Sequence, residues 1–333
     1  MKLTEAEQIV YSIALTRAQS SVQELSTLCG LREHTVRRAL GKLVDLGVFE
    51  RKAVMLNNSA LGLTNFKIFA SLEGASEEES ATFISDMKAH SRVRVFAELG
   101  AEYQYELDFL VNSSLELNTI LQNFNPLYAR KLRIHSMVIA QGDDVYGQKW
   151  FMPSSVGIEP IKCREVAPQT IDETDHKILR RIGEQDFGSI RDLARELSIP
   201  TSTLTYRLER LEQVGIIASY FYVFNVKRVR RLPFYLLVEY QGISMETHEK
   251  FLQYCEKHRA INFLTRCTGQ WSYLVFMEVA DFEEARIVRN EVHDSYFKDL
   301  ARVVLIPQVT YHRYSAYPFK ELAEVQGASE KKE

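Results

Sequence analysis

The stretch "IPTSTLTYRLERLEQVGIIASY", Ile199 to Tyr220, has the pattern of an amphipathic helix followed by a glycine and a short strand. Leu204, Leu208 and Leu211 are spaced four and three residues apart, which places them on one face of a helix. A similar stretch, "LREHTVRRALGKLVDLGVFERK", lies 168 residues earlier, from Leu31 to Lys52. The apolar positions are kept between the two stretches and the polar positions differ. The chain therefore carries this helix twice.

The repeat extends well beyond this helix. "SVQELSTLCG" (residues 21–30) corresponds to "SIRDLARELS" (189–198), and "AELGAEYQYELDFLV" (97–111) resembles "TRCTGQWSYLVFMEV" (265–279). Each half of the chain thus resembles the other over most of its length. A duplicated unit of roughly 150 residues accounts for this, and that period is too long for a solenoid.

The composition is that of an ordinary globular protein with two to four domains. The chain has 333 residues, 46% hydrophobic and 26% charged, with a net charge of −3. The net charge gives no overall positive potential of the kind that indicates a nucleic-acid-binding protein. A local basic face is nevertheless sufficient to bind nucleic acid. The four cysteines, Cys29, Cys163, Cys255 and Cys267, have no CxxC spacing, and the N-terminus "MKLTEAEQIV" does not resemble a signal peptide. Because the apolar runs are also too short to span a bilayer, a reduced cytoplasmic protein is expected.

The first third of each half has helical periodicity. Residues 3–17 predict a helix with Thr4 as N-cap and Glu7 at the capping-box position. A short helix over 21–29 and a third helix over 32–46, ended by Gly47 in a left-handed conformation, follow. "VFERKAVML" then predicts a short hairpin. The second half repeats this series, with helices over 172–183, 189–197 and 201–214, then Gly215 and "IIASYFYVFN".

The remainder of each half alternates between strand and helix patterns. In the second half, "FYLLVEYQG", "INFLTRCTG", "WSYLVFMEVA" and "ARVVLIPQVTYHRY" read as strands, and two helical stretches separate them. This order is β-α-β-β-α-β, the ferredoxin-like arrangement. The first half gives the same series between Phe66 and about Tyr146. The stretch 150–170 contains three prolines and no periodicity, which indicates a linker.

A short helix, a tight turn and a second helix make a helix-turn-helix, and a following hairpin makes it winged. The second helix of such a unit enters the major groove with its N-terminal residues at base edges. Arginine and lysine there can bind phosphates or guanine. The exposed face of the second helix in the unit, called its reading face below, is basic in the first half of the chain and mostly neutral in the second half. The predicted DNA-binding residues are Arg32, His34, Arg37, Arg38, Lys42, Thr201, Ser202, Thr205, Tyr206, Arg207 and Arg210.

The stretch "IDETDHKILRRI…SIRDLARELSIPTSTLTYRLERLEQVGIIASY" resembles the N-terminal domain of leucine-responsive regulator/AsnC (Lrp/AsnC) transcription regulators. That family implies a winged helix-turn-helix followed by a ferredoxin-like domain that senses an effector. The expected fold is α+β, with two winged helix-turn-helix domains and two ferredoxin-like domains in tandem. The expected boundaries are 1–58 and 64–148 for the first pair, 149–169 for the linker, 170–226 and 232–318 for the second pair, and 319–333 for a tail.

The resemblance also implies a small amino-acid-like effector bound where sheet domains pack together. Glu102 could accept a hydrogen bond from the ammonium group of the effector, and Tyr103 and Trp271 could pack against its apolar side chain. Ser272 stands where the family has an acid. The alternative interpretation is that the glycines only turn a hairpin and the aromatic rings only pack. The expected effector-binding residues are Gly100, Glu102, Tyr103, Gly269, Trp271 and Ser272.

Two other classes of function stay open. Siroheme- and heme-pathway decarboxylases resemble the same two-part architecture, but the Arg-His-rich segment that they carry is missing from "LGAEYQYELDF" and "TGQWSYLVFME". A regulator that acts through protein partners without contacting DNA is the other alternative. The histidines show no ligand spacing, and no phosphate loop or nucleophile motif is present, so we expect neither a metal, a cofactor nor an enzyme.

The difference between the two reading faces has a simple interpretation. Family members associate as symmetric dimers, so that two identical recognition helices read a pseudo-palindromic operator. Fusing two units in one chain removes this constraint, and each helix can then change independently. We therefore expect one chain to read two unlike half-sites roughly 34 Å apart, and two such chains to form a dimer. The alternative is that one helix has lost its base contacts.

Overall fold

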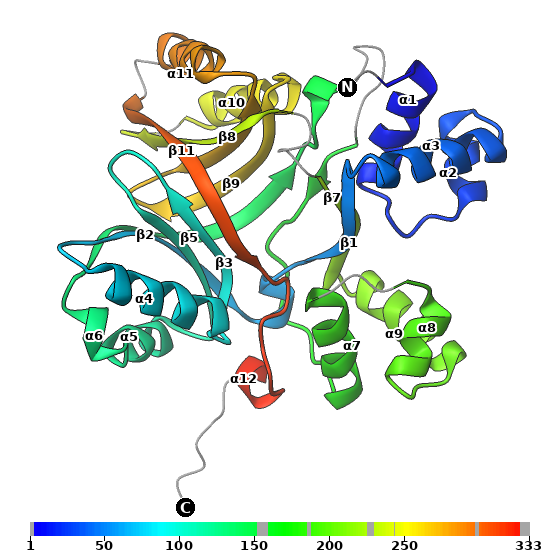
Figure 1. Cartoon of the computed structure of the whole chain (residues 1–333), viewed down its shortest axis with the longest axis horizontal. Coiled ribbons are helices and arrows are strands. Elements are labelled where there is room, and N and C mark those ends of the chain that lie inside the picture. Colours follow the sequence, from blue (N-terminus) through cyan, green and yellow to red (C-terminus); the bar gives the residue numbers. More distant parts are fainter. Residues whose placement is uncertain are drawn as a thin grey trace, which may run out of the picture. The chain divides into compact units, whose positions relative to one another are not determined.

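The computed structural model describes residues 3–151, 159–184, 188–224, 230–242, 244–296 and 300–326. Two series of elements follow one another along the chain (Figure 1). Each series has three helices, one strand, and then the order β-α-β-β-α-β that the alternating sequence pattern predicts. The predicted α+β fold with two trihelical domains and two ferredoxin-like domains is confirmed.

The first series comprises α1 Glu5–Leu15, α2 Val22–Cys29, α3 Glu33–Asp45, β1 Phe49–Leu56, β2 Thr64–Leu72, α4 Glu77–Ala89, β3 Val93–Leu99, β4 Tyr105–Val111, α5 Ser114–Gln122, α6 Pro126–Ala129 and β5 Leu132–Val145. A short strand, β6 Ile161–Lys162, lies between the two series. The second series comprises α7 Glu173–Glu184, α8 Ile190–Glu196, α9 Thr201–Gln213, β7 Ile217–Phe224, β8 Leu232–Tyr240, α10 Met245–Lys257, β9 Ile261–Gly269, β10 Tyr273–Val279, α11 Phe282–Tyr296 and β11 Leu300–Tyr314, followed by α12 Ala323–Gln326.

The capping signals of the sequence set the starts of the helices. Thr4 accepts a hydrogen bond from the backbone of Glu7, whose carboxylate accepts one from the backbone of Thr4 in return. Ser21 and Glu24 form the same capping box at α2. Gly47 and Gly215 follow the third helix of each series with φ values of 65° and 77°, which glycine adopts without steric cost.

The predicted hairpin after each third helix is wrong. Residues 49–56 form one continuous strand, β1, whose partner is β7, the corresponding strand of the second series. The ring of Phe49 stacks on that of Tyr222 with centroids 4.1 Å apart. The physical reason is that "ERKAVML" contains no glycine, proline, asparagine or aspartate, which two-residue hairpin turns require.

The chain forms two compact units, and each combines the helical domain of one series with the sheet domain of the other. Unit 1 contains Met1–Ala53, Gly142–Cys163 and Ser219–Gln308, and unit 2 contains Val54–Gln141, Arg164–Ala218 and Val309–Glu333. Four of the boundaries fall inside strands β1, β5, β7 and β11, so these strands start in one unit and end in the other. The two series therefore exchange their helical and sheet domains.

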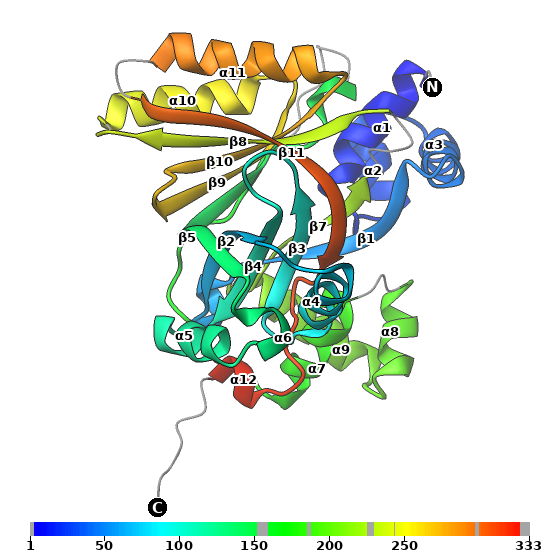
Figure 2. The same ribbon diagram turned by 60° about the vertical axis from the view of Figure 1, so that its left-hand side comes forward.

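In unit 1 the strand order is β11–β8–β10–β9–β5–β6. Leu236 lies opposite Val275 on one side and Leu305 on the other, in antiparallel pairs. Helices α10 and α11 lie side by side over one face of this sheet (Figure 2) and bury Phe251 and Val288 against it. The core is thus the layer between two helices and a sheet, as in other ferredoxin-like domains.

In unit 2 the strand order is β5–β2–β4–β3–β11. Phe83 of α4, Phe96 of β3 and Tyr128 of α6 meet edge to face in its core. The end of the chain that the structure describes is part of this unit: Phe319 is buried, and Glu324 accepts a hydrogen bond from Ser91. Residues 319–326, expected as a tail, are therefore packed against the sheet domain.

Candidate nucleic-acid interface

The third helix of each series is anchored by one apolar face. Val36, Ala39 and Leu43 of α3 are buried, and Leu40, expected in the same stripe, is half-buried at its edge. In α9 the buried face is Leu204, Leu208 and Leu211, as the sequence predicts. The polar residues between them are directed outward, so each helix presents a reading face.

The N-termini of these two helices differ from their neighbours. Arg32 and Pro200 occupy the N-cap positions of α3 and α9, and neither gives a side-chain hydrogen bond to the helix. By contrast, Thr4, Ser21 and Ser189 cap the preceding helices with their side chains. The first N–H groups of α3 and α9 thus keep their capacity to donate to an anion such as a phosphate.

Three arginines dominate the reading face of α3. Arg32, Arg37 and Arg38 are exposed, and no residue within the described ranges forms an ion pair with any of them. His34 is exposed beside them, with Nε2 3.3 Å from the hydroxyl of Thr35. A guanidinium without an internal partner is free to form the bidentate contacts that phosphate and guanine offer.

Lys42, which is predicted to contact DNA, forms an ion pair within the domain. Its Nζ lies 2.7 and 2.8 Å from the two carboxylate oxygens of Glu7 in α1. Burial alone would raise the pKa of Glu7, but the hydrogen bonds from Lys42 and from the backbone of Thr4 outweigh it and leave the pKa lowered. Lys42 therefore holds the recognition helix to the first helix.

Arg207 and Arg210 of α9 have the same internal role. Arg207 donates to Asp172 and Asp175, and Arg210 donates to Asp175, all at 2.8 Å between nitrogen and oxygen. Asp175 is fully buried at the start of α7. Asp175 and Arg210 stand 168 residues after Glu7 and Lys42. An acid and a base repeated at these equivalent positions were the signal that sequence reasoning missed.

What remains of the reading face of α9 is neutral except for the exposed acid Glu209. Thr201, Ser202 and Tyr206 are exposed, Tyr206 to 65%. The hydroxyl of Thr205 donates to the carbonyl of Thr201 at 3.0 Å. Hydroxyl groups can donate to phosphates and accept from or donate to base edges, but they supply no net charge. Because Arg207 and Arg210 are paired with acids, the charge of the two reading faces differs more than the number of basic residues on each helix suggests.

The expected effector residues lie at two hairpin turns. Gly100, Glu102 and Tyr103 lie between β3 and β4. Gly269 ends β9, and Trp271 and Ser272 lie between β9 and β10. The two aromatic rings are buried: Tyr103 lies 5.3 Å from Phe69 between ring centroids, and the guanidinium of Arg302 lies over Trp271. Ser272 accepts from the backbone of Tyr240. The two rings are thus already packed, whereas Glu102 and Gly269 are exposed.

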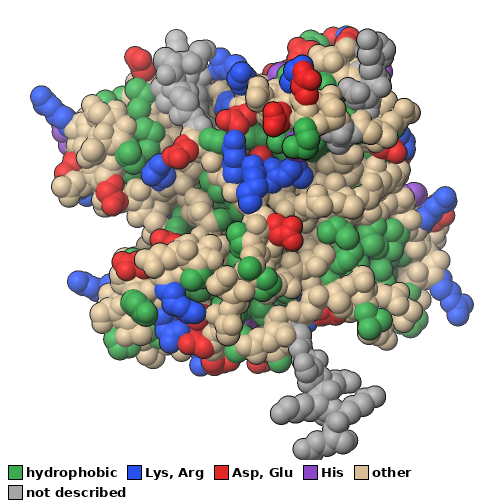
Figure 3. All heavy atoms as spheres, turned by 180° about the vertical axis from the view of Figure 1, so that it is seen from behind, with side chains coloured by type: hydrophobic (Ala, Val, Ile, Leu, Met, Phe, Trp, Pro, Cys, Tyr) green, Lys and Arg blue, Asp and Glu red, His purple; other side chains and the backbone are tan. Residues whose placement is uncertain are grey.

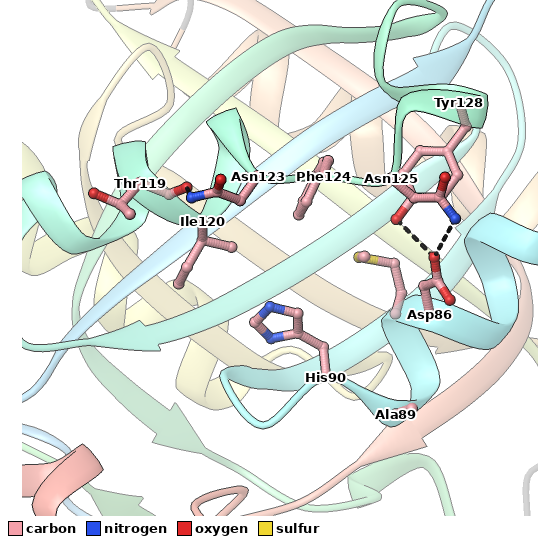
Figure 4. Close-up of a pocket in the computed structure, with 10 residues that line it drawn as sticks. Asp86, Ala89, His90, Thr119, Ile120, Asn123, Phe124, Asn125 and Tyr128 are labelled. Atoms are coloured by element: carbon pink, nitrogen blue, oxygen red, sulfur yellow. Dashed lines mark hydrogen bonds between the residues drawn. The ribbon is translucent and has the colours of Figure 1, made fainter.

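A pocket of about 530 Å³ lies elsewhere in unit 2, between the C-terminal ends of α4 and α5 (Figure 4). Ile120 and Phe124 form its apolar floor, and Asp86 accepts hydrogen bonds from Tyr128 and Asn125 at one side. Burial and the nearby arginines lower the pKa of His90, and its Nδ1 accepts from the backbone of Arg92. Sequence reasoning did not find this pocket, because no motif marks it.

Other kinds of site are not apparent in the described ranges. They contain no group of three or more histidine, cysteine, aspartate or glutamate residues that could hold a metal. None of the helices in these ranges is both long and apolar enough to cross a membrane. Figure 3 shows basic and acidic side chains interspersed over the face that it displays, in agreement with the net charge of −3. The basic reading face of α3 needs only a local excess of charge, which this net charge allows.

Sequence comparisons identify relatives that are described as transcription regulators. Residues 171–218 match a family described as winged helix-turn-helix DNA-binding. The transcriptional activator DecR of Escherichia coli is 24% identical over 135 residues, which cover 40% of this chain and 84% of DecR. The regulator LrpC of Bacillus subtilis is 26% identical over 113 residues, or 34% of this chain and 77% of LrpC. An uncharacterised HTH-type regulator of Pyrococcus horikoshii is 24% identical over 129 residues, 38% and 86% of the two chains.

A structural comparison covers the whole chain. The crystal structure of the siroheme decarboxylase NirDL matches 97% of this chain with 96% of its own, at a TM-score of 0.61 and 13% sequence identity. At that identity the match establishes the fold only. The predicted resemblance to Lrp/AsnC regulators is confirmed by the sequence relatives. The complete arrangement of two helical and two sheet domains also occurs in an enzyme.

Proposed function

We propose that this chain, which is similar to Lrp/AsnC transcription regulators, is a cytoplasmic, sequence-specific DNA-binding regulator and not an enzyme. The observation that carries the proposal is the reading face of α3. Arg32, Arg37 and Arg38 are exposed beside uncapped N–H groups, and no described residue pairs with them. The winged helix-turn-helix match of residues 171–218 supports the same function for the second series.

The two helices would contact DNA through different chemistry. The arginines of α3 would form bidentate hydrogen bonds to guanine or ion pairs with phosphates, and the free N–H groups would bind a phosphate. Thr201, Ser202 and Tyr206 of α9 would contact base edges and the backbone without adding positive charge. We propose that one chain reads two unlike half-sites, and that two chains associate as a dimer.

A gel shift with genomic DNA fragments tests the DNA-binding function. We expect specific binding that weakens steeply as salt rises, because each phosphate contact releases counterions and adds about 0.9 to the slope of log K against log salt. The measurement is the dissociation constant at several salt concentrations between about 50 and 200 mM. A chain that binds no fragment at low salt, although it is folded, contradicts the proposal.

We further propose that a small amino-acid-like effector modulates the regulator. Two places offer an acid for its ammonium group: Glu102 at a hairpin turn and Asp86 in the pocket. A thermal-shift screen of the common amino acids should yield one or a few ligands, and a ligand at 100 times its dissociation constant should stabilise the chain by about 2.7 kcal/mol. Glu102→Gln and Asp86→Asn then distinguish the two places. No shift with any amino acid at millimolar concentration contradicts effector binding.

A second candidate function is that of a siroheme or heme decarboxylase, because the fold of NirDL extends over the whole chain. Against it, the turns "LGAEYQYELDF" and "TGQWSYLVFME" lack the Arg-His-rich segment of those enzymes, and their rings are packed inside the units. A visible absorption spectrum of the protein mixed with heme separates the two functions. A shifted and sharpened Soret band at stoichiometric heme would favour the enzyme, and the spectrum of free heme would favour the regulator.

A further inference from the structure

A buried carboxylate lies at the junction of the first helical domain and the second sheet domain. Glu278, in β10, is 3% exposed, and both of its oxygens accept hydrogen bonds from the segment that follows β5. Gln148 Nε2 donates to Oε1 at 3.4 Å, and Trp150 Nε1 donates to Oε2 at 3.1 Å. All three residues belong to unit 1. The carboxylate thus fixes the segment that joins the two series.

Gln148, which donates to Glu278, is also hydrogen-bonded to helix α1. Its Oε1 accepts a hydrogen bond from the hydroxyl of Tyr11 at 2.9 Å. Tyr11 is fully buried, and its ring packs against Phe49 and Phe151 at centroid distances of 5.4 and 4.7 Å. One amide side chain therefore bridges the phenol of α1 and the carboxylate of β10.

Helix α1 is packed directly against the recognition helix. Val10 and Tyr11 share one buried cluster with Val36 and Leu43 of α3. The ion pair between Glu7 and Lys42 adds a polar link between the same two helices. A movement of α1 at Tyr11 would consequently move α3, whose outer face carries Arg37 and Arg38.

We propose that Glu278 is a protonation-sensitive joint that sets the position of α1, and through it of the recognition helix α3, by reversing the hydrogen bonds of Gln148. With the carboxylate ionised, Tyr11 donates to Gln148 Oε1 and Gln148 Nε2 donates to Glu278, as the structure has them. With the carboxyl group protonated, its O–H donates to Gln148 Oε1 after the amide rotates, and Nε2 donates to the oxygen of Tyr11. The second arrangement keeps Gln148 between Glu278 and Tyr11 with one proton more, and the O–H of Tyr11 then turns away from Gln148.

The surroundings allow the carboxyl group to change its charge near neutral pH. Burial raises the pKa of Glu278 to about 7, against the hydrogen bonds from Trp150 and Gln148, the neighbouring amide of Asn262 and the charge of Arg231, which favour the ionised form. Arg231 is itself paired with Glu284 at 2.8 Å and lies over the ring of Trp150. Burial and the charge of Glu278 raise the pKa of Tyr11, so the phenol stays neutral and can donate or accept.

One other group of this segment titrates in the same range and must be separated from Glu278. Burial lowers the pKa of Lys149 to about 7. Its Nζ is directed to the carbonyl oxygens of Cys255 and Glu256 at the end of α10, at 2.9 and 2.7 Å. Lys149→Met removes that titration and leaves Glu278, Gln148 and Tyr11 in place, which makes it the matched control.

The direct test follows the indole proton of Trp150 by NMR on the full chain labelled with ¹⁵N-tryptophan. The chain has two tryptophans, and Trp150→Phe assigns the signals. We expect the Trp150 indole signal to shift with pH in a one-proton transition centred near 7. The transition should persist in Lys149→Met and vanish in Glu278→Gln, whose amide mimics the protonated group. A signal that does not move between pH 5.5 and 8.5 overturns the proposal, as does a transition that survives Glu278→Gln.

The coupling to the recognition helix is measured by hydrogen exchange of peptides from α1 and α3, corrected for the intrinsic pH dependence of exchange. Protection in the wild type should change by at least about fivefold between pH 6 and 8, and Glu278→Gln should show no such change. Equal protection in both proteins at pH 8 would mean that the joint titrates without acting on α3, and the proposal would be wrong. These two measurements need no DNA, so they stand or fall separately from the proposed function.

If the chain binds DNA as proposed, a third readout follows. The ratio of the affinities of wild type and Glu278→Gln should differ at least about fivefold between pH 8 and pH 6. Protonation of any other group is common to both proteins and cancels in the ratio. A ratio that does not depend on pH contradicts the link between Glu278 and DNA.

Discussion

Replacing both Arg37 and Arg38 of α3 with alanine is expected to lower the affinity for the operator about 100-fold at constant salt. Each arginine that reads a guanine contributes about 1–3 kcal/mol of discrimination, and each that contacts a phosphate contributes about 0.9 to the salt slope. Both side chains are exposed and have no ion-pair partner among the described residues, so their loss should not disturb the fold. The measurement is a binding isotherm at several salt concentrations.

The control removes the same charge from another part of unit 1. Lys250 and Lys257 are exposed on α10, in the sheet domain, and the double alanine variant should bind DNA nearly as the wild type does. Footprinting adds the second test: the variant of Arg37 and Arg38 should lose protection at one half-site, and a variant of Thr205 and Tyr206 at the other. If both variants affect the same base pairs, or the second affects none, the reading of two unlike half-sites is wrong.

Asp175→Ala is expected to destabilise the second helical domain by about 2–4 kcal/mol, the largest effect of a single substitution in either ion-pair site. Asp175 is fully buried and accepts from both Arg207 and Arg210 at 2.8 Å. Without the Asp175 carboxylate, the buried side of both guanidinium groups loses its hydrogen-bond acceptor. The ion pairs of this carboxylate that join α9 to the start of α7 are then lost. Equilibrium unfolding in urea, followed by circular dichroism, measures the change.

An exposed ion pair gives the comparison. Glu246 and Lys250 are four residues apart on α10, and their side chains are 76% and 64% exposed. Glu246→Ala should therefore cost less than about 0.5 kcal/mol. The proposed structural role of Asp175 fails if its replacement is as mild as that of Glu246, or if it weakens DNA binding while the stability stays unchanged.

Local features of the fold could be predicted from the sequence because they depend on neighbouring residues. The capping boxes at Thr4 and Ser21 and the left-handed glycines Gly47 and Gly215 follow from spacings of a few positions. The alternation of strands and helices likewise gave the ferredoxin-like order. Pairing between strands that are distant in the sequence could not be predicted in this way. Nothing in "ERKAVML" specifies that its partner is a strand of the second series.

The candidate site was only partly predictable for the same reason. The position of Arg37 and Arg38 on an outer helix face follows from helical periodicity. Whether a basic residue on these helices has an ion-pair partner depends on an acid in another helix, so the sequence does not reveal that Lys42, Arg207 and Arg210 pair with Glu7 and Asp175. The burial of Trp271 and Tyr103 also depends on tertiary packing that no local pattern reveals.

The exchange of domains between the two series has a consequence for biosynthesis. Unit 1 begins with Met1–Ala53 and is complete only with residues up to Gln308. At about 5–20 residues per second, a ribosome needs roughly 13 to 50 s to make the chain between Ala53 and Gln308. Until residues 219–308 have been made, the nascent first helical domain lacks the strand that carries Tyr222 and the carboxylate of Glu278. The apolar side chains that pack against them in the folded protein stay exposed to solvent until then. Co-translational chaperones, and codons that set the pace of translation, therefore bear on the yield of this protein.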